Sequence, residues 1–220
     1  MTTRFTKRTG GVSHGAFASL NLGTHVGDAL SDVQRNREIL TVEVGPTQYM
    51  NQVHGNRIAL IEQVTEEVPT ADALVTGIPG ISLAVMVADC IPLLLKSTES
   101  VAAVHVGRRG LVNDITRKTL ELMRDMGALK ITAIIGPAIC GVCYEVSEEI
   151  FSEVVSLHPS AASRTKAGSF ALDLPAALRS VLSDEGIEIV DEFDCTVENN
   201  DYFSFRRDGV TGRQVGVISL

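Results

Sequence analysis

The chain has 220 residues, of which 45% are hydrophobic and 21% are charged, so it can bury a sizeable core and is not a disordered protein. Its formal net charge of −8 excludes nucleic acid as the principal partner, because no broad basic surface is available for a phosphate backbone; only a local basic pocket for a small anion fits that charge. Aromatic residues make up 5% and Trp is absent, which argues against base-stacking platforms and aromatic sugar-binding clefts.

Apolar, β-branched segments alternate along the chain with segments of helical periodicity. In chain order, the expected elements are a helix over 32–44, strands over 81–87 and 101–105, a helix over 111–126 that stops at Gly127, a strand over 131–135, a helix capped by Ser147, a surface loop over 158–169, a helix from Pro175 to Gly186, and strands over 187–193, 202–205 and 214–220. This mixture predicts an α/β or α+β fold with helices covering sheets. No linker or repeat divides the chain, so we expect a single domain over residues 1–220.

Neither the N-terminal residues nor the longest apolar run predicts a membrane segment. The basic N-terminal residues are not followed by an apolar stretch, so they do not form a secretory signal. The longest apolar run, 78–95, is interrupted by Pro79, Asp89 and Pro92 and is too broken for a spanning helix. We therefore expect a soluble, cytoplasmic protein without a membrane partner.

Three residues with metal-ligand chemistry lie where predicted strands meet loops: His54, Cys90 and His105. Zinc in catalytic sites usually takes three protein ligands and keeps a fourth position for water or substrate, and one Cys with two His is an accepted donor set. The separations of 36 and 15 residues match no short zinc-finger pattern. On spacing alone the alternative stays open: two hydrogen-bonded histidines near strand ends and one buried thiol.

Charged neighbours of this set allow two interpretations each. Asp89, beside Cys90, is either a general base or substrate acceptor, or the residue that caps the turn before Pro92. Arg108 and Arg109, ahead of a predicted helix, are either a seat for phosphate or another anion, or solvated surface residues.

The other cysteines and histidines carry weaker signals. Cys140 and Cys143 form a C-x-x-C pair that can be redox-active or bind metal, but a zinc ribbon needs a second pair; a structural or substrate-adjacent role is favoured. Cys195 is interpreted as a packed thiol. The remaining histidines are interpreted as surface or loop residues; they are His14, His25 and His158.

Motifs in a fixed order run nearly from end to end of the chain. They are Gly11–Ser13, Phe17–Gly23, Val26–Asp28, Asn36-Arg37, Gln52–Gly55, Asp72–Thr76, Ala88–Pro92, Val104–Gly107, Gly136–Ile139, Cys143–Val146, Leu172–Leu174 and Phe203–Arg213. Together they resemble the YfiH-like or laccase-domain family, also labelled polyphenol oxidoreductases. The chain departs from the family at Arg108, where Trp is common, and at Cys140-Gly141, where Gly-Pro is common.

The resemblance implies a fold and a metal centre. The fold is a four-layer α/β/β/α arrangement related to the catalytic domain of cytotoxic necrotising factors. In the family, the His of Q-V-H-G, the Cys of A-D-C and the His of A-V-H-x-G coordinate one metal, usually taken as zinc; here they are His54, Cys90 and His105. A copper label also exists, but a multicopper laccase needs more histidines than the five in this chain, and zinc has no redox chemistry.

Similar members are assigned phosphorolysis of adenosine, inosine, guanosine or methylthioadenosine to base and ribose 1-phosphate, and deamination of adenosine. This implies a nucleoside and inorganic phosphate as partners. We assign Arg109 to phosphate placement, and Asp89 to proton transfer when zinc-activated water attacks C6 of adenine.

Two other functions compete with this hypothesis. One is a Cys90–His105 amidase that edits peptidoglycan precursors, in which the thiol is free to act as a nucleophile. The other is a metal-stabilised scaffold without turnover. For the oligomeric state, which the sequence leaves open, we favour a monomer.

Overall fold

Two mixed sheets contain most of the strands in the computed structural model, which describes residues 2–220. The four-stranded sheet has the order β1 (Thr2–Phe5), β12 (Gln214–Ser219), β5 (Ser82–Val87), β2 (Thr47–Gln48). The six-stranded sheet has the order β11 (Glu188–Asp191), β8 (Thr132–Ile135), β6 (Ile91–Lys96), β7 (Val101–Val106), β4 (Ala73–Thr76), β3 (Ile58–Leu60). A separate ribbon pairs β9 (Ala162–Arg164) with β10 (Phe170–Leu172).

The strands β5 and β6 are mostly apolar, with Ser82 and Lys96 at their ends, because both faces of each sheet are covered. In β5, alternate side chains enter different cores: Leu83 and Val85 face the core between the two sheets, whereas Ala84 and Met86 contribute to the core under α1. The sheets are therefore packed face to face, and the short connection from β5 to β6 passes from one sheet to the other.

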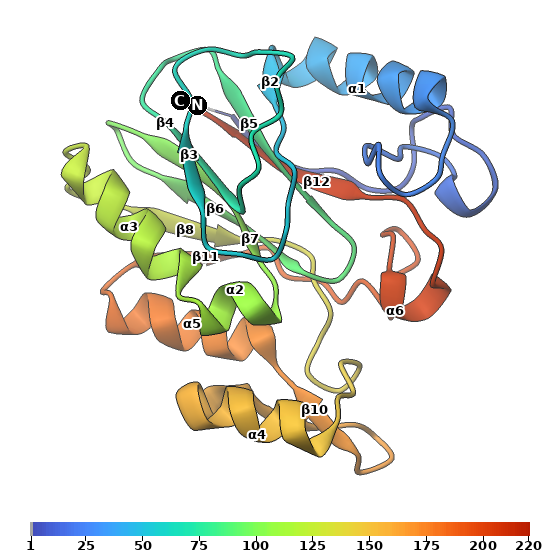
Figure 1. Ribbon diagram of the computed structural model, residues 1–220, viewed down its shortest axis with the longest axis vertical. Coiled ribbons are helices and arrows are strands. Elements are labelled where there is room, and N and C mark those ends of the chain that lie inside the picture. The colour runs from blue at the N-terminus through green and yellow to red at the C-terminus, as the bar shows by residue number, and fades with distance from the viewer. Residues whose placement is uncertain (1) are drawn as a thin grey trace.

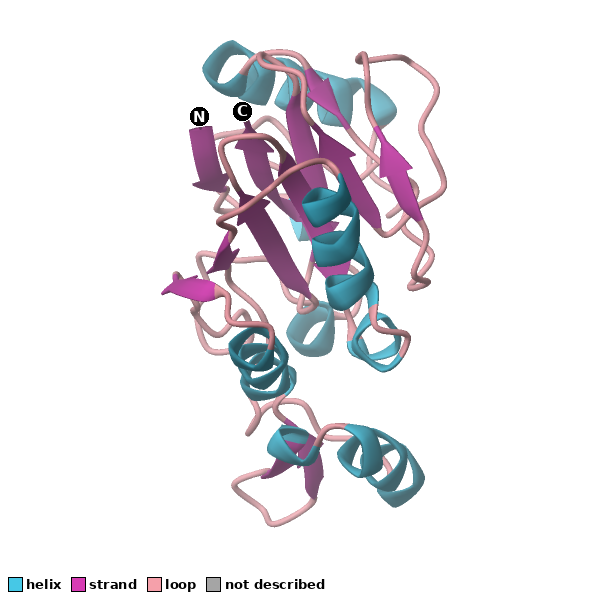
Figure 2. Ribbon diagram, turned by 90° about the vertical axis from the view of Figure 1, so that its left-hand side faces the viewer, coloured by secondary structure: helices cyan, strands magenta, loops and turns pink. Residues whose placement is uncertain are grey.

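Helices cover the outer faces of the sheets (Figure 1). Their bounds are α1 (Leu30–Val44), α2 (Arg108–Val112), α3 (Ile115–Asp125), α4 (Glu148–Leu157), α5 (Leu174–Asp184) and α6 (Phe205–Asp208), with 3-10 turns η1 (Gly15–Phe17) and η2 (Pro159–Ala161). Residues of α1 pack on the four-stranded sheet, and those of α3 and α5 on the six-stranded sheet. In Figure 2, α4 and the β9–β10 ribbon lie at one end, below the two sheets.

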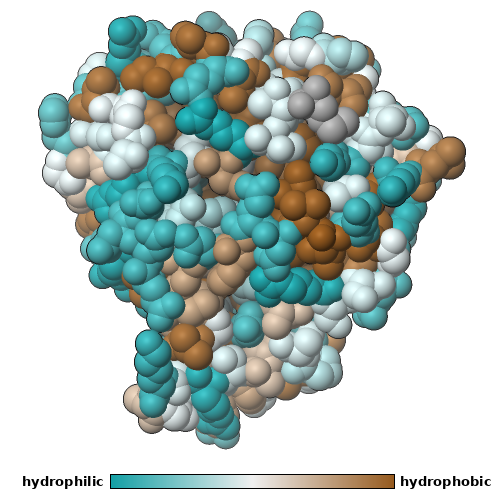
Figure 3. Space-filling model, turned by 180° about the vertical axis from the view of Figure 1, so that it is seen from behind, coloured by the Kyte–Doolittle hydropathy of each residue, from teal (hydrophilic) through white to brown (hydrophobic). Residues whose placement is uncertain are grey.

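The described helices include none that is both long enough and apolar enough to cross a membrane. On the face opposite that of Figure 1, hydrophilic and hydrophobic residues are interspersed (Figure 3).

The α/β prediction is confirmed, and most predicted elements occur within a few residues of their expected bounds. Ser147 caps α4 as predicted, since its side chain accepts a hydrogen bond from the Ile150 amide. Helix 111–126 is instead two helices, because the chain turns at Asp114 with φ 64°. The predicted strand over 202–205 is wrong: Ser204 caps the short helix α6. The predicted loop over 158–169 contains η2 and β9.

Candidate metal centre and pocket

The two sheets bring His54, Cys90 and His105 together at one edge of the core between them. His54 lies in the loop between β2 and β3, Cys90 in the turn between β5 and β6, and His105 in β7 opposite Pro92 of β6. Val101 and Ala103 of β7 face the inter-sheet core, so alternation places His105 on the same side at the strand's end. One ligand atom from each residue of this triad lies within 4.8 Å of the others, a spacing that suits a single metal ion.

Asp72, directly before β4, orients two members of the triad. Its fully buried carboxylate accepts hydrogen bonds from the backbone amides of His54 (2.9 Å) and Gly55 (2.7 Å), and contacts Nδ1 of His105 at 2.9 Å. A carboxylate can only accept, so Nδ1 keeps its proton, and Nε2 is the ring nitrogen that can bind a metal once it has lost its own proton. The sequence analysis recognised Asp72 only as part of a motif. The signal for its role is a buried aspartate that directly precedes an apolar strand.

The backbone at the triad is in an uncommon conformation. His54 has φ 58° and Asp89 has φ 95°, both in the left-handed region that non-glycine residues rarely occupy. Such conformations persist only where surrounding contacts impose them, and they cluster at functional sites. Here the amide bonds from His54 and Gly55 to Asp72 impose the first. Those from the Thr196 hydroxyl (2.7 Å) and the Arg206 amide (2.6 Å) to the Asp89 carboxylate impose the second.

Electrostatic coupling makes Cys90 acidic and His105 basic in the metal-free chain. Burial by itself raises the pKa of the Cys90 thiol, but the imidazoles of His105 and His54 outweigh burial and lower it to about 6. Burial by itself lowers the pKa of His105, but Cys90 and Asp72 outweigh it and raise it to about 9. Burial also works against ionisation of Asp72, yet hydrogen bonds from His105, Gly55 and His54 leave its pKa below the ordinary value. The thiol is therefore readily available as a thiolate, the form that binds metals.

The triad lies in the wall of a pocket of about 450 Å³, a volume typical of small-molecule sites. The lining is partly apolar, with Met86, Ile139 and Leu174, and it also includes three arginines. Arg108 forms an ion pair with Glu153 (3.3 Å) at the rim. The other two arginines are Arg206, which donates to the Glu145 carbonyl oxygen (2.8 Å), and Arg213, which donates to Thr211 and Gly212 carbonyl oxygens (3.1 and 2.9 Å).

The pocket is therefore locally basic although the chain is acidic. Across residues 2–220, Arg206 and Arg213 take part in no ion pair, and their guanidinium groups donate hydrogen bonds only to carbonyl oxygens; that of Arg206 also lies 5.1 Å from the centre of the Tyr144 ring. A guanidinium without a carboxylate partner in a concave site is suited to binding an anion.

The structure separates the remaining predicted site residues. Asp89 lines the pocket. Arg109 does not: it is exposed on α2 and outside the lining, because the helix turns its neighbour Arg108 inward instead. His25, interpreted as a loop residue, does line the pocket, and so does Arg213. Sequence analysis missed both because they come from loops distant in the chain.

Gly107 leaves just enough room for the triad. A Cβ added there would lie 3.0 Å from Sγ of Cys90 and 3.2 Å from Cδ2 of His54. Its φ of −89° suits any residue, so only this crowding opposes a side chain.

We expect Gly107→Ala to displace the two ligands by a few tenths of an ångström and to weaken metal binding about tenfold. Competition with a chelator measures the affinity. Gly77→Ala is the matched control, because its Cβ would meet the Glu99 carbonyl oxygen at a similar 3.2 Å, away from the pocket. Equal affinities in both variants would contradict the expectation.

Comparison with known proteins gives consistent matches over the whole described chain. A family model described as multi-copper polyphenol oxidoreductase laccase matches residues 2–220. The chain is 42% identical over 228 residues to a purine nucleoside phosphorylase of Corynebacterium glutamicum, covering 98% of this chain and 93% of that one.

Solved structures share the fold. A Neisseria meningitidis protein matches with a TM-score of 0.91 at 39% identity, covering 99% of this chain and 93% of that one. Bacillus licheniformis YfiH matches with a TM-score of 0.89 at 29% identity, covering 100% and 92%.

Proposed function

The chain belongs to the family of laccase-like polyphenol oxidoreductases that includes the YfiH proteins, and from that membership we propose that it is a zinc-dependent purine nucleoside phosphorylase. The observation that carries the proposal is one pocket that combines the triad with the guanidinium groups of Arg206 and Arg213, which have no carboxylate partner. Relatives named purine nucleoside phosphorylase support the reaction class.

Zinc fits the triad better than a redox-active copper cluster. One thiolate and two imidazoles leave a fourth coordination position for a reactant, as in catalytic zinc sites. The family description names several coppers, yet the chain has five histidines. Of the two potential ligand groups within residues 2–220, only the triad contains histidine. A bound zinc ion would supply positive charge and Lewis acidity at this wall of the pocket.

The reaction itself exchanges the base of a nucleoside for phosphate. An oxygen of hydrogen phosphate forms a bond to C1′ of the ribose while the bond from C1′ to N9 breaks. The purine leaves with the bonding electron pair and takes up the proton of hydrogen phosphate. In this proposal Arg206 and Arg213 bind the phosphate, with Arg108 at the rim, in the role that the sequence had suggested for Arg109.

Adenosine deamination is a finer part of the proposal, and it has less support. Asp89, the proposed proton carrier, lines the pocket, but its two carboxylate oxygens accept hydrogen bonds from Thr196 and Arg206. Those bonds suit a positioning role for Asp89 as well as they suit proton transfer.

We also propose that residues 1–220 are one YfiH-like domain with the four-layer arrangement related to cytotoxic necrotising factors; the family match over 2–220 supports this.

The function is tested with zinc-loaded protein and adenosine, inosine, guanosine or methylthioadenosine, with and without phosphate. The expected products are free base and ribose 1-phosphate, formed only when phosphate is present. Release of the base without phosphate would indicate a nucleoside hydrolase. Conversion of adenosine to inosine without release of a base would indicate a deaminase. No product above that of a His54→Ala control would end the proposal.

A Cys–His hydrolase is the second candidate, and the lowered pKa of Cys90 beside two imidazoles favours it. The two functions place opposite demands on the thiol: a zinc ligand is blocked, whereas a nucleophile must be free.

Alkylation of Cys90 at different pH values separates them. In metal-free protein the thiolate forms above pH about 6 rather than the ordinary 9.0, so alkylation should be fast at neutral pH and slow below pH about 6. With zinc bound, we expect strong protection that chelation removes. Mass spectrometry of the peptide with Cys90 gives the rates. Fast alkylation in the metal-replete protein would favour the hydrolase instead.

A further inference from the structure

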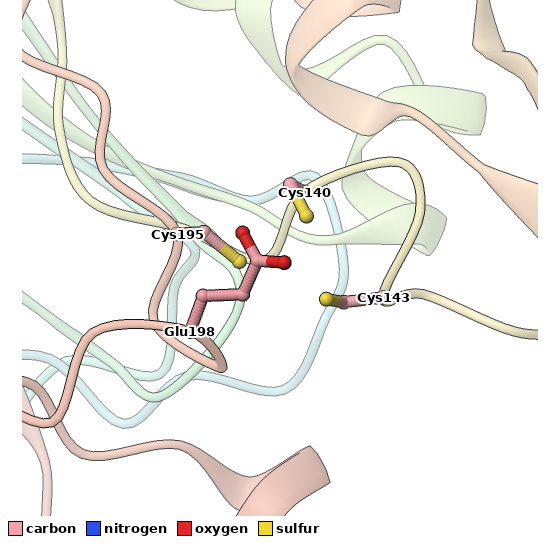
Figure 4. A group of neighbouring side chains, drawn as sticks. All are labelled: Cys140, Cys143, Cys195 and Glu198. Atoms are coloured by element: carbon pink, nitrogen blue, oxygen red, sulfur yellow. The ribbon is translucent and has the colours of Figure 1, made fainter. Parts of the chain in front are cut away.

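A second group of potential ligands lies outside the pocket: Cys140, Cys143, Cys195 and Glu198. Their ligand atoms all lie within 4.8 Å of one another. Figure 4 shows the three sulfur atoms and the carboxylate converging from two loops, one following β8 and one following β11. All three thiols are free, and none of the four residues lines the pocket.

The two loops present their donors with the same spacing. Cys140-x-x-Cys143 is matched by Cys195-x-x-Glu198, which is the second pair that the sequence analysis did not find. The Cys143 amide donates to the Cys140 carbonyl oxygen (3.1 Å), which forms a tight turn between the two cysteines. Cys195 is therefore part of a cluster and not an isolated packed thiol.

Backbone pairing joins the two loops next to the cluster. Ala138 and Cys195 form a parallel bridge, with hydrogen bonds from Ala138 N to Asp194 O (3.0 Å) and from Thr196 N to Ala138 O (3.1 Å). This pairing positions one donor pair against the other before any ion binds.

We propose that Cys140, Cys143, Cys195 and Glu198 form a second metal site, a structural one that binds Zn²⁺. Three thiolates and a carboxylate complete a four-coordinate set, the closed arrangement of structural zinc sites. With Zn–S bonds near 2.3 Å, tetrahedral geometry places sulfurs about 3.8 Å apart, so donors within 4.8 Å need only a small contraction. Thiolates favour zinc over magnesium or calcium.

The donor set favours a metal over redox chemistry. A redox-active C-x-x-C pair needs only two thiols, whereas the thiol of Cys195 and the carboxylate of Glu198 complete a set of four donors. Zinc would bind the cysteines as thiolates, so their protons would be released on binding. The exposed ammonium of Lys166, 3.4 Å from Glu198, is a weak surface partner that zinc can displace.

The proposed site connects to the pocket through Asp89. The Ile139 amide, next to Cys140, donates to the Asp89 carbonyl oxygen (2.9 Å), and the Thr196 hydroxyl, next to Cys195, donates to its carboxylate (2.7 Å). Zinc bound to the cluster would therefore fix both loops that support the left-handed turn ahead of Cys90.

Metal analysis of the full chain, purified without added metal or chelator, tests the proposal. We expect two zinc equivalents in the wild-type chain and one in Cys143→Ser. Cys90→Ser, which removes a thiolate from the triad, is the matched control and should retain the cluster zinc. After cobalt substitution, the thiolate-to-metal absorption typical of three thiolates should persist in Cys90→Ser and be lost in Cys143→Ser.

The zinc contents of the two variants decide whether the cluster binds metal. Zinc that is lost in Cys143→Ser but kept in Cys90→Ser supports the cluster even if the triad binds nothing, so this test is independent of the proposed function. Equal zinc content in the wild type and Cys143→Ser, or a Cys140–Cys143 disulfide in the native chain, would overturn the proposal.

Glu198→Gln is a second variant that tests the site without disturbing the fold. The side chain is exposed, and glutamine has nearly the same size and shape as glutamate. It should weaken zinc binding by the cluster at least about tenfold in chelator competition. Unchanged affinity would remove Glu198 from the ligand set and contradict the four-donor site.

Discussion

Replacing His54 by alanine is expected to lower kcat/KM for nucleoside phosphorolysis at least about a thousandfold, which corresponds to about 4 kcal/mol of lost transition-state stabilisation. His54 is one of three proposed ligands, and two donors bind zinc far more weakly than three. The side chain is exposed and contacts Cys90 at 3.9 Å, so its removal leaves no cavity in the core. Steady-state kinetics and metal content, measured together, show whether activity and zinc are lost in parallel.

Two further variants exclude a backbone effect. Alanine is disfavoured at the φ of 58° that His54 adopts, whereas asparagine tolerates it. His54→Asn should therefore retain wild-type stability and still lose most of its activity. His14→Ala, at an exposed loop histidine outside the pocket, should retain zinc and rate. A His54 variant with full zinc content and full activity would remove this residue from the metal centre.

Replacing Asp72 by asparagine should have the second largest effect, on stability as well as on the metal. The carboxylate accepts from three successive amides, those of Val53, His54 and Gly55, and from the His105 ring. The NH₂ group of asparagine would face some of these N–H donors in a fully buried position, where neither group could find an acceptor. We expect the free energy of unfolding to fall by about 2–4 kcal/mol, measured by denaturant titration.

The same change should lower zinc affinity about 10- to 100-fold, since the buried carboxylate fixes the ring orientation of His105. Asp191→Asn is the matched control: this carboxylate pairs with Arg179 at the surface, and its loss should cost less than about 1 kcal/mol without changing zinc binding. Equal losses of stability in the two variants would contradict the role assigned to Asp72.

The sequence predicted elements whose signals are local. The run 81–87 identified β5 because both of its faces are buried, and Ser147 identified the start of α4. It did not predict β6, because Pro92 next to a polar turn suggests an interruption. In the structure this proline is near the start of the strand, where a missing amide is tolerated.

The site shows the same division between local and long-range information. The residues alone left the triad as one of two interpretations, and only the resemblance to a family joined its members. Asp72, Arg213 and Glu198 were not predicted as site residues, since each acquires its role from partners far away in the chain. Arg109 was chosen over Arg108 because the sequence does not reveal which side of a short helix faces a pocket.

The turn that connects β5 to β6 links the two sheets, and Cys90 lies in it, opposite ligands that come from other segments. These donors meet only when the sheets have packed, so the unfolded chain cannot offer the same site. The proposed zinc would then bind the native state alone, and mass action would tie the melting temperature to the free zinc concentration. At a hundredfold excess over Kd, the native state gains about 2.7 kcal/mol. The free energy of unfolding measured in a chelating buffer would thus be that of the metal-free chain, and it would be lower than the value at high free zinc.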